Sequence, residues 1–217
     1  MPKRGLLIFD LDGTLFQAHK VTVPATQRSF EEQGLPAPPA DEICSFFGRP
    51  VSAFNAWIRT LAPPESAQEL IKSVARLELE MVAQAGELYP QVRQVLTTLR
   101  ASVVHMAICT NGHQGYVQRV LTTQNLGGFF DAVRYRQIEN ENKTLMAREL
   151  LARLSSRPAI IIGDRSDDVQ AAHQNGIQAI AATYGYGAAH ELQPADAAAA
   201  SPADLPALVQ TLWDKNQ

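Results

Sequence analysis

The sequence predicts an α/β protein with a Rossmann-like core, an open parallel sheet covered by helices on both faces, and an inserted α-helical cap domain. The main observation is an alternation along the chain. Short apolar runs typical of buried parallel strands alternate with segments whose apolar residues follow helical spacing. The strand-like runs are Leu6–Phe9, Val103–Cys109, Ala132–Tyr135, Ala159–Ile162 and Ala179–Ala182.

A long interruption between the first two runs is the second observation, and it predicts the cap. Roughly ninety residues separate these runs, far more than one crossover helix needs. Within them, Glu65–Ala85 repeats apolar residues on one helical face, and Val23–Gly34 and Ile43–Leu61 are typical of shorter helices. The predicted domains are therefore a helical cap, residues 17–87, and a core, residues 1–16 and 88–217.

The remaining helices follow from the same spacing. Val92–Leu99 predicts a helix that leads back into the sheet, and Val117–Leu121, Leu145–Leu154 and Leu205–Leu212 predict helices between or after the later strands. The alanine run at Ala197–Ala200 predicts a helix or a loop near the C-terminus.

Composition excludes several classes of partner. The chain has 217 residues, 46% of them hydrophobic, a net charge of −3 and a pI near 5.9. It has no long basic run that would attract nucleic acid or an anionic membrane surface, and no apolar stretch long enough to span a bilayer. We therefore expect a cytoplasmic protein with a small soluble ligand, whereas the sequence carries no indication of oligomeric state.

Polar residues follow four of the predicted strands. Because the carboxyl ends of parallel strands lie at one edge of an open sheet, and ligands bind at that edge, these residues are the candidate site. They are Asp10, Asp12, Gly13 and Thr14 after the first strand, Thr110, Asn111 and Gly112 after the second, Lys143 beyond the third, and Gly163, Asp164, Asp167 and Asp168 after the fourth.

The chemistry open to these residues is narrow. Several carboxylates at one edge repel each other unless a cation lies among them, and oxygen ligands without His or Cys favour Mg²⁺. One carboxylate of the Asp10 and Asp12 pair can then attack phosphorus while the second moves a proton. Gly13 permits a tight turn that brings backbone N–H groups toward a phosphate. Taken alone, Asp10 and Asp12 would also suit a turn and a helix cap.

The motifs that carry these residues resemble those of the haloacid dehalogenase superfamily. DLDGTLF (Asp10–Phe16), ICTNG (Ile108–Gly112), Lys143 and IGDRSDDVQAAHQNG (Ile162–Gly176) occur in the order of its four motifs. The helical insertion between the first and second motifs resembles the phosphoglycolate-phosphatase-like branch. The resemblance covers essentially the whole chain.

The resemblance implies a role for each matched residue. Asp10 would be the nucleophile and a Mg²⁺ ligand. Asp12 would protonate the leaving oxygen, then activate water, and bind Mg²⁺ through its backbone carbonyl. Asp164 would bind the metal, and Asp168 would support the metal or its water. The remaining assignments are Thr110 and Asn111, which would hold the transferring phosphoryl group, and Lys143, which would stabilise its charge.

Other residues leave alternatives open. Asp167 does not match the motif and is expected to be an exposed neighbour. Arg165 replaces a small hydroxyl residue of many relatives, and it either contacts another acid or faces solvent. In the cap, Arg49 either contacts a substrate anion or is a surface arginine. The aromatic residues around Arg49 form either a substrate wall or the core of the cap: Phe46, Phe47, Phe54 and Trp57.

These inferences leave three classes of function. The first is a Mg²⁺-dependent phosphatase acting on a small phosphate monoester similar to phosphoglycolate, through an aspartyl-phosphate intermediate. The alternatives are a phosphomutase of the same fold and a non-catalytic relative that binds a ligand. A dehalogenase is disfavoured because hydrolysis of a carbon–halogen bond needs neither Asp12 as an acid nor a metal site.

Overall fold

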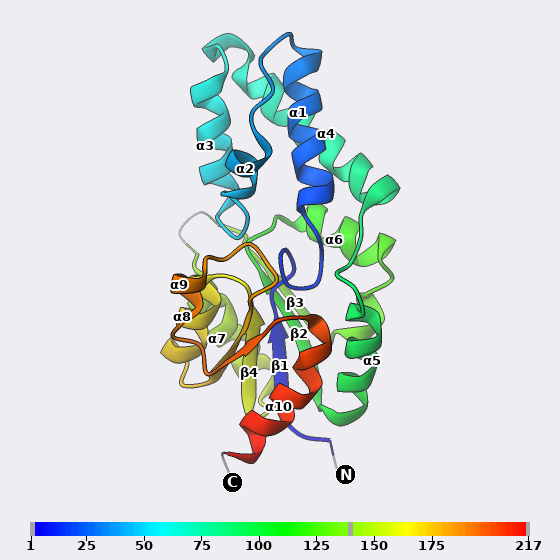
Figure 1. Ribbon diagram of the computed structural model, residues 1–217, viewed down its shortest axis with the longest axis vertical. Helices are drawn as coiled ribbons and strands as arrows, with labels where there is room; N and C mark the ends of the chain where they lie inside the picture. Colours follow the sequence, from blue (N-terminus) through cyan, green and yellow to red (C-terminus); the bar gives the residue numbers. More distant parts are fainter. Residues whose placement is uncertain (1–2, 139–140, 216–217) are drawn as a thin grey trace.

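A computed structural model describes residues 3–138 and 141–215, and its centre is a parallel sheet in the order β3-β2-β1-β4-β5-β6 (Figure 1). This confirms the predicted α/β class and its parallel sheet. Each strand pairs in parallel with its neighbours. The strands are β1 (Leu6–Phe9), β2 (His105–Thr110), β3 (Ala132–Tyr135), β4 (Ala159–Gly163), β5 (Gln178–Ala182) and β6 (Ala197–Ala199).

Helices cover both faces of the sheet. Leu7 and Phe9 of β1 pack on one face with α5 (Val92–Ser102), α6 (Gln114–Thr123) and α10 (Leu205–Asp214). Leu6 and Ile8 alternate to the opposite face, where they pack with residues of α7 (Lys143–Leu154) and α8 (Ser166–Gln174). Because both faces of β1 are buried, its sequence is a continuous apolar run rather than an alternating one.

The strand order places a switch point at β1. The chain passes from β1 to β2 and β3 on one side, then returns to β4, β5 and β6 on the other side. A crevice forms outside the carboxyl ends of the strands where the direction of winding reverses. The residues directly after β1, β2 and β4 therefore lie beside that crevice.

The strand at Ala197–Ala199 corrects the expectation of a helix or a loop there. β6 pairs with Ile180–Ala182 at the edge of the sheet. Alanine favours helices in isolation, but pairing with an existing strand outweighs so small a preference. Short segments complete the core: η1 (Gly127–Phe129), α9 (Ala189–Leu192) and η2 (Pro202–Asp204).

Four helices form a lobe beyond the carboxyl ends of the strands, at the top of Figure 1. They are α1 (His19–Glu32), α2 (Ala40–Cys44), α3 (Val51–Leu61) and α4 (Pro64–Ala85). Leu70 and Val74 of α4 pack with Phe30 and Ile58 in a cluster separate from those of the sheet. The exact domain boundaries at residues 17 and 87 stay a prediction.

Helix α1 begins before its predicted start at Val23. Pro24 lies inside it, although proline lacks the N–H that a helix interior uses. Val21 and Ala25 on either side are fully buried, and α1 packs along α4. This packing outweighs the cost of the proline. Among the residues that the structure describes, no helix has the length and apolar character needed to cross a membrane.

Candidate active site

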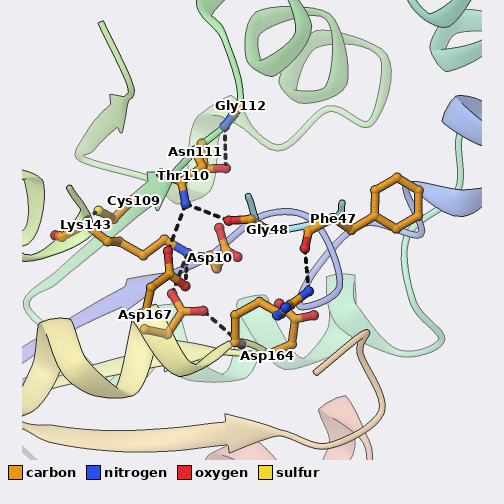
Figure 2. A network of polar contacts seen from close by, with 12 residues as sticks. Asp10, Phe47, Gly48, Cys109, Thr110, Asn111, Gly112, Lys143, Asp164 and Asp167 are labelled. Carbon is orange, nitrogen blue, oxygen red and sulfur yellow. Dashed lines mark hydrogen bonds and ion pairs between the residues drawn. The ribbon is translucent and has the colours of Figure 1, made fainter. Parts of the chain in front are cut away.

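Three acids and one lysine meet at the carboxyl ends of β1 and β4 (Figure 2). The Nζ atom of Lys143 lies 3.1 Å from Asp10 Oδ2 and 2.7 Å from Asp168 Oδ1. Asp164 follows β4, and Asp168 lies in the first turn of α8. All four side chains are buried, with at most 2% of each residue exposed. The structure therefore brings together residues from the first, third and fourth predicted motifs.

Local structure fixes the two ends of this cluster. Asn142 accepts the backbone N–H of Leu145 at 2.9 Å and caps α7, so Lys143 is the first residue of that helix. Asp168 accepts the backbone N–H of Arg165 through Oδ2 at 3.1 Å, while its Oδ1 faces Lys143. Each helix start thus orients one charged side chain into the cluster.

The acids are arranged as metal ligands. Asp10, Asp164 and Asp168 each offer a carboxylate oxygen within 4.8 Å of the others. Burial raises the pKa of all three, to about 7 for Asp164, where repulsion from Asp10 adds to the effect. Asp164 Oδ1 is buried without a hydrogen-bond partner among the described residues. Hard oxygen donors, burial and an unsatisfied ligand atom fit Mg²⁺.

Lys143 neutralises only part of the negative charge of the acidic cluster. Although burial alone would lower it, the pKa of Lys143 is held well above its usual value by Asp10, Asp167 and Asp168. Lys143 therefore remains charged at neutral pH. Its single charge faces several carboxylates, which leaves the cluster with an excess of negative charge that a divalent cation would remove.

Two glycines make room for the acids. A Cβ atom at Gly163 would lie 2.0 Å from Asp168 Cγ, and one at Gly13 would lie 2.1 Å from Asp164 Oδ2. Gly13 also adopts a φ of +79°, as expected for the tight turn. Its own N–H donates to Phe16 O at 3.0 Å, and the expectation that the turn brings backbone N–H groups toward a phosphate stays a prediction.

The second aspartate of the pair is held by a residue that sequence analysis missed. The Tyr116 hydroxyl donates to Asp12 Oδ1 at 2.7 Å, and only 4% of Tyr116 is exposed. Burial raises the pKa of Asp12 well above its usual value, and this hydrogen bond opposes the rise. Tyr116 follows the second motif by four residues, but in a helical apolar pattern it is typical of core packing, so the sequence offered no separate signal.

The two neutral residues of the second motif differ in what they offer. Thr110 accepts the N–H of Gly112 at 3.2 Å, which leaves its hydroxyl hydrogen for a ligand. The amide nitrogen of Asn111 donates to Gly48 O at 2.7 Å and to Asp167 Oδ2 at 2.8 Å (Figure 2). Both of its amide hydrogens are thus engaged, so its side chain joins the cap loop to the core in this arrangement. The role of Asn111 toward a phosphoryl group stays a prediction.

Asp167 and Arg165 both make contacts with other charged side chains. The sequence predicts Asp167 to be an exposed neighbour, but it is half-buried, with 36% of its side chain exposed, and its Oδ1 lies 3.6 Å from Lys143 Nζ. Arg165 contacts another acid, Glu191, at 3.0 Å, so the second alternative, that it faces solvent, is wrong. Arg165 also donates to the backbone oxygen of Phe47 in the cap at 2.6 Å.

A cavity of about 320 Å³ opens between this cluster and the cap lobe. Asp10, Asp12 and Thr110 line its core side, whereas Arg49 and Glu78 line its cap side. Arg49 thus faces the same cavity as the acids, with its guanidinium 5.4 Å from the centre of the Phe46 ring. Its role toward an anion stays a prediction.

The cap aromatics satisfy both of the alternatives that the sequence left open. Phe46 packs against Phe54 and Trp57, with ring centroids 5.7 and 4.9 Å apart. Phe47 instead packs against Tyr186 of the core at 4.5 Å. Three of these residues, Phe46, Phe47 and Phe54, also line the cavity. The same aromatic side chains therefore pack the lobe and form an apolar wall.

Known proteins are similar to this chain over most of its length. The family model described as haloacid dehalogenase-like hydrolase matches residues 7–182. A phosphoglycolate phosphatase of Pseudomonas putida is 28% identical over 190 residues, which is 83% of this chain and 70% of that protein. The tyrosine-protein kinase PtkA of Mycobacterium tuberculosis is 27% identical over 188 residues, 85% of this chain and 64% of that protein.

Among solved structures, a haloacid dehalogenase-like hydrolase of Streptococcus pneumoniae superposes with a TM-score of 0.80. It is 26% identical, and the match covers 95% of this chain and 98% of the other. The chain therefore belongs to the haloacid dehalogenase-like hydrolase family. This confirms the resemblance that the four motifs indicated.

Proposed function

We propose that the protein is a Mg²⁺-dependent phosphatase that hydrolyses a small phosphate monoester, in the size range of phosphoglycolate, through an aspartyl-phosphate intermediate. One observation carries the proposal. Asp10 and Asp12 face the same cavity, and only Asp10 contacts Lys143 and the acidic cluster, whereas Asp12 is held by Tyr116. Two neighbouring carboxyl groups in different environments suit a nucleophile and a proton carrier.

In the first half-reaction, a carboxylate oxygen of Asp10 forms a bond to phosphorus, and the bond from phosphorus to the ester oxygen breaks. Asp12 gives its proton to that leaving oxygen. Burial raises the pKa of Asp12, which favours the protonated form that this step needs. The products are an alcohol and phosphorylated Asp10.

In the second half-reaction, Asp12 is a carboxylate and accepts a proton from water, and the water oxygen bonds to phosphorus. The acyl phosphate bond breaks, which releases inorganic phosphate and restores Asp10. Asp12 regains its proton in this step, so one residue serves as acid and then as base.

The other residues bind and orient. Lys143 places its charge beside Asp10, and Thr110 offers its hydroxyl hydrogen to the oxygens of the phosphoryl group. Asp10, Asp164 and Asp168 would hold Mg²⁺, together with the backbone carbonyl of Asp12. When bound, Mg²⁺ neutralises the carboxylates and polarises the phosphoryl group.

The test is phosphate release from a panel of small esters, with and without Mg²⁺, using Asp10→Asn as the control. Asp10→Asn keeps the shape of the side chain and removes the nucleophile, so we expect turnover to fall by about 1,000-fold or more. Release that needs both Mg²⁺ and Asp10 supports the proposal. Turnover close to wild type in Asp10→Asn would overturn the mechanism, and phosphate moved between positions of one sugar would indicate a phosphomutase.

A further inference from the structure

One carboxyl group of the cavity has no part in the chemistry described above. Glu78 lies on α4 and lines the cavity from the cap side, opposite Asp12. Thr22 of α1 donates its hydroxyl hydrogen to Glu78 Oε1 at 2.6 Å. The second oxygen, Oε2, accepts no hydrogen bond from any residue that the structure describes. Glu78 therefore presents a free acceptor to whatever occupies the cavity.

The surroundings of Glu78 are apolar and carry no compensating charge. Ile71, Val74 and Ala75 of the same helix line the cavity beside it. Within the described part of the chain, no lysine, arginine or histidine forms an ion pair with Glu78. Burial raises the pKa of Glu78 to about 7, and the hydrogen bond from Thr22 only partly opposes this.

The one arginine of the cavity does not balance this acid. Arg49 is an exposed residue at the cavity wall and lies over the Phe46 ring rather than against Glu78. Water screens an exposed charge, whereas the apolar walls around Glu78 do not. The interior of the cavity therefore repels a second anionic group on the substrate and attracts a hydrogen-bond donor.

We propose that Glu78 is a specificity-determining residue that accepts a hydrogen bond from a hydroxyl or ammonium group on the leaving group of the substrate. The preferred substrates are then small hydroxyl- or amine-bearing phosphate esters, and carboxylate-bearing esters of the same size are disfavoured. This inference rests on the proposed phosphatase function and adds to it the class of leaving group. It separates this chain from relatives that act on phosphoglycolate, whose leaving group carries a carboxylate.

Three esters with a two-carbon leaving group test the inference, because they differ only in their terminal group. They are 2-phosphoglycolate, 2-hydroxyethyl phosphate and phosphoethanolamine. Each is measured as a substrate, and as a competitor of p-nitrophenyl phosphate hydrolysis. We expect the hydroxyl and ammonium esters to exceed phosphoglycolate in kcat/KM, and to compete better, by about tenfold or more.

The variant Glu78→Gln removes the charge and keeps the shape, so it should reduce this preference to within about threefold. p-Nitrophenyl phosphate lacks a terminal donor, so its kcat/KM should change less in Glu78→Gln than the kcat/KM of the hydroxyl and ammonium esters. The matched control is Glu80→Gln on the same helix, since Glu80 is exposed and pairs with Arg76 at 2.8 Å outside the cavity. Glu80→Gln should leave the preference unchanged.

A second variant tests the inference in case Glu78→Gln fails to fold. Thr22→Val keeps the volume of the side chain but removes the donor to Glu78, and we expect it to shift the preference in the same direction by a smaller factor. An unchanged preference in Glu78→Gln, or a wild-type preference for phosphoglycolate, would overturn the inference while leaving the phosphatase intact. Failure of the proposed function is different, because no ester would then release phosphate in a manner that depends on Asp10.

Discussion

The two walls of the cavity hold their charges in opposite ways. On the core wall, Asp10 is buried and pairs at 3.1 Å with Lys143, which also pairs at 2.7 Å with Asp168. On the cap wall, the Thr22 hydroxyl is the one partner of Glu78 among the residues that the structure describes, and Arg49 lies over an aromatic ring. The core wall is a preorganised arrangement that suits any phosphoryl group. The cap wall instead leaves a hydrogen-bond acceptor of Glu78 free for the rest of the substrate.

Two hydrogen bonds join the core to the loop of the cap. Asn111 and Arg165 of the core each donate to a backbone oxygen of the cap loop, Gly48 O and Phe47 O respectively. Backbone oxygens are present whatever side chains the loop carries. The contacts can therefore hold the cap over the site without restricting which side chains face the substrate.

The largest effect should come from breaking the core wall. Lys143→Met leaves Asp10 and Asp168 buried without their cation, so we expect a loss of about 3 kcal/mol in the free energy of unfolding at pH 8 without Mg²⁺. Activity should be lost as well. The stability deficit should shrink at pH 5, because the raised pKa values of these acids let them take up protons and become neutral. Urea unfolding at both pH values measures it, and an equal deficit at both would contradict this account.

A smaller effect should come from the acid of the cap wall. Folding raises the pKa of Glu78 from 4.5 to about 7, so the folded state binds this proton more tightly than the unfolded state. Stability from this group is therefore present at low pH and is lost as pH rises from about 4.5 to 7. Because Glu78 is partly open to the cavity, we expect wild type to lose about 2 kcal/mol relative to Glu78→Gln over this window.

Thermal or urea unfolding of the two proteins from pH 4 to pH 8 measures this difference, with Glu80→Gln as the variant that should show none. Groups common to both proteins cancel in the comparison. A difference that does not vary with pH would show that Glu78 is fully solvated, and would weaken the contrast between the walls.

The smallest effect should come from the hydrogen bond between Tyr116 and Asp12. Tyr116→Phe removes a donor to the charged form of Asp12, so the pKa of Asp12 should rise further. The acidic limb of the kcat profile should move to higher pH, and turnover at pH 7 should fall by about tenfold. A uniform loss of rate with an unmoved profile would show that Tyr116 serves packing alone.

Much of the fold and of the core wall could be predicted from local patterns. Five strands lie where apolar runs indicated them, with ends displaced by no more than two residues, as in the run predicted at Val103–Cys109 and observed at His105–Thr110. Asp10, Asp164 and Lys143 converge because each lies next to the carboxyl end of a strand or at the start of a helix, and a parallel sheet aligns such positions. The exception is β6, since alanine has no strand pattern of its own.

The sequence by itself determined which residues lie at the carboxyl edge of the sheet, and hence the family and the core of the site. Only the tertiary structure decided which side chains complete it. Tyr116 reaches Asp12 across 104 positions of sequence, and Thr22 reaches Glu78 across 56. The physical reason is that strand and helix periods are set by neighbouring residues, whereas a contact between residues far apart in the sequence depends on how separate elements pack, which leaves no local pattern.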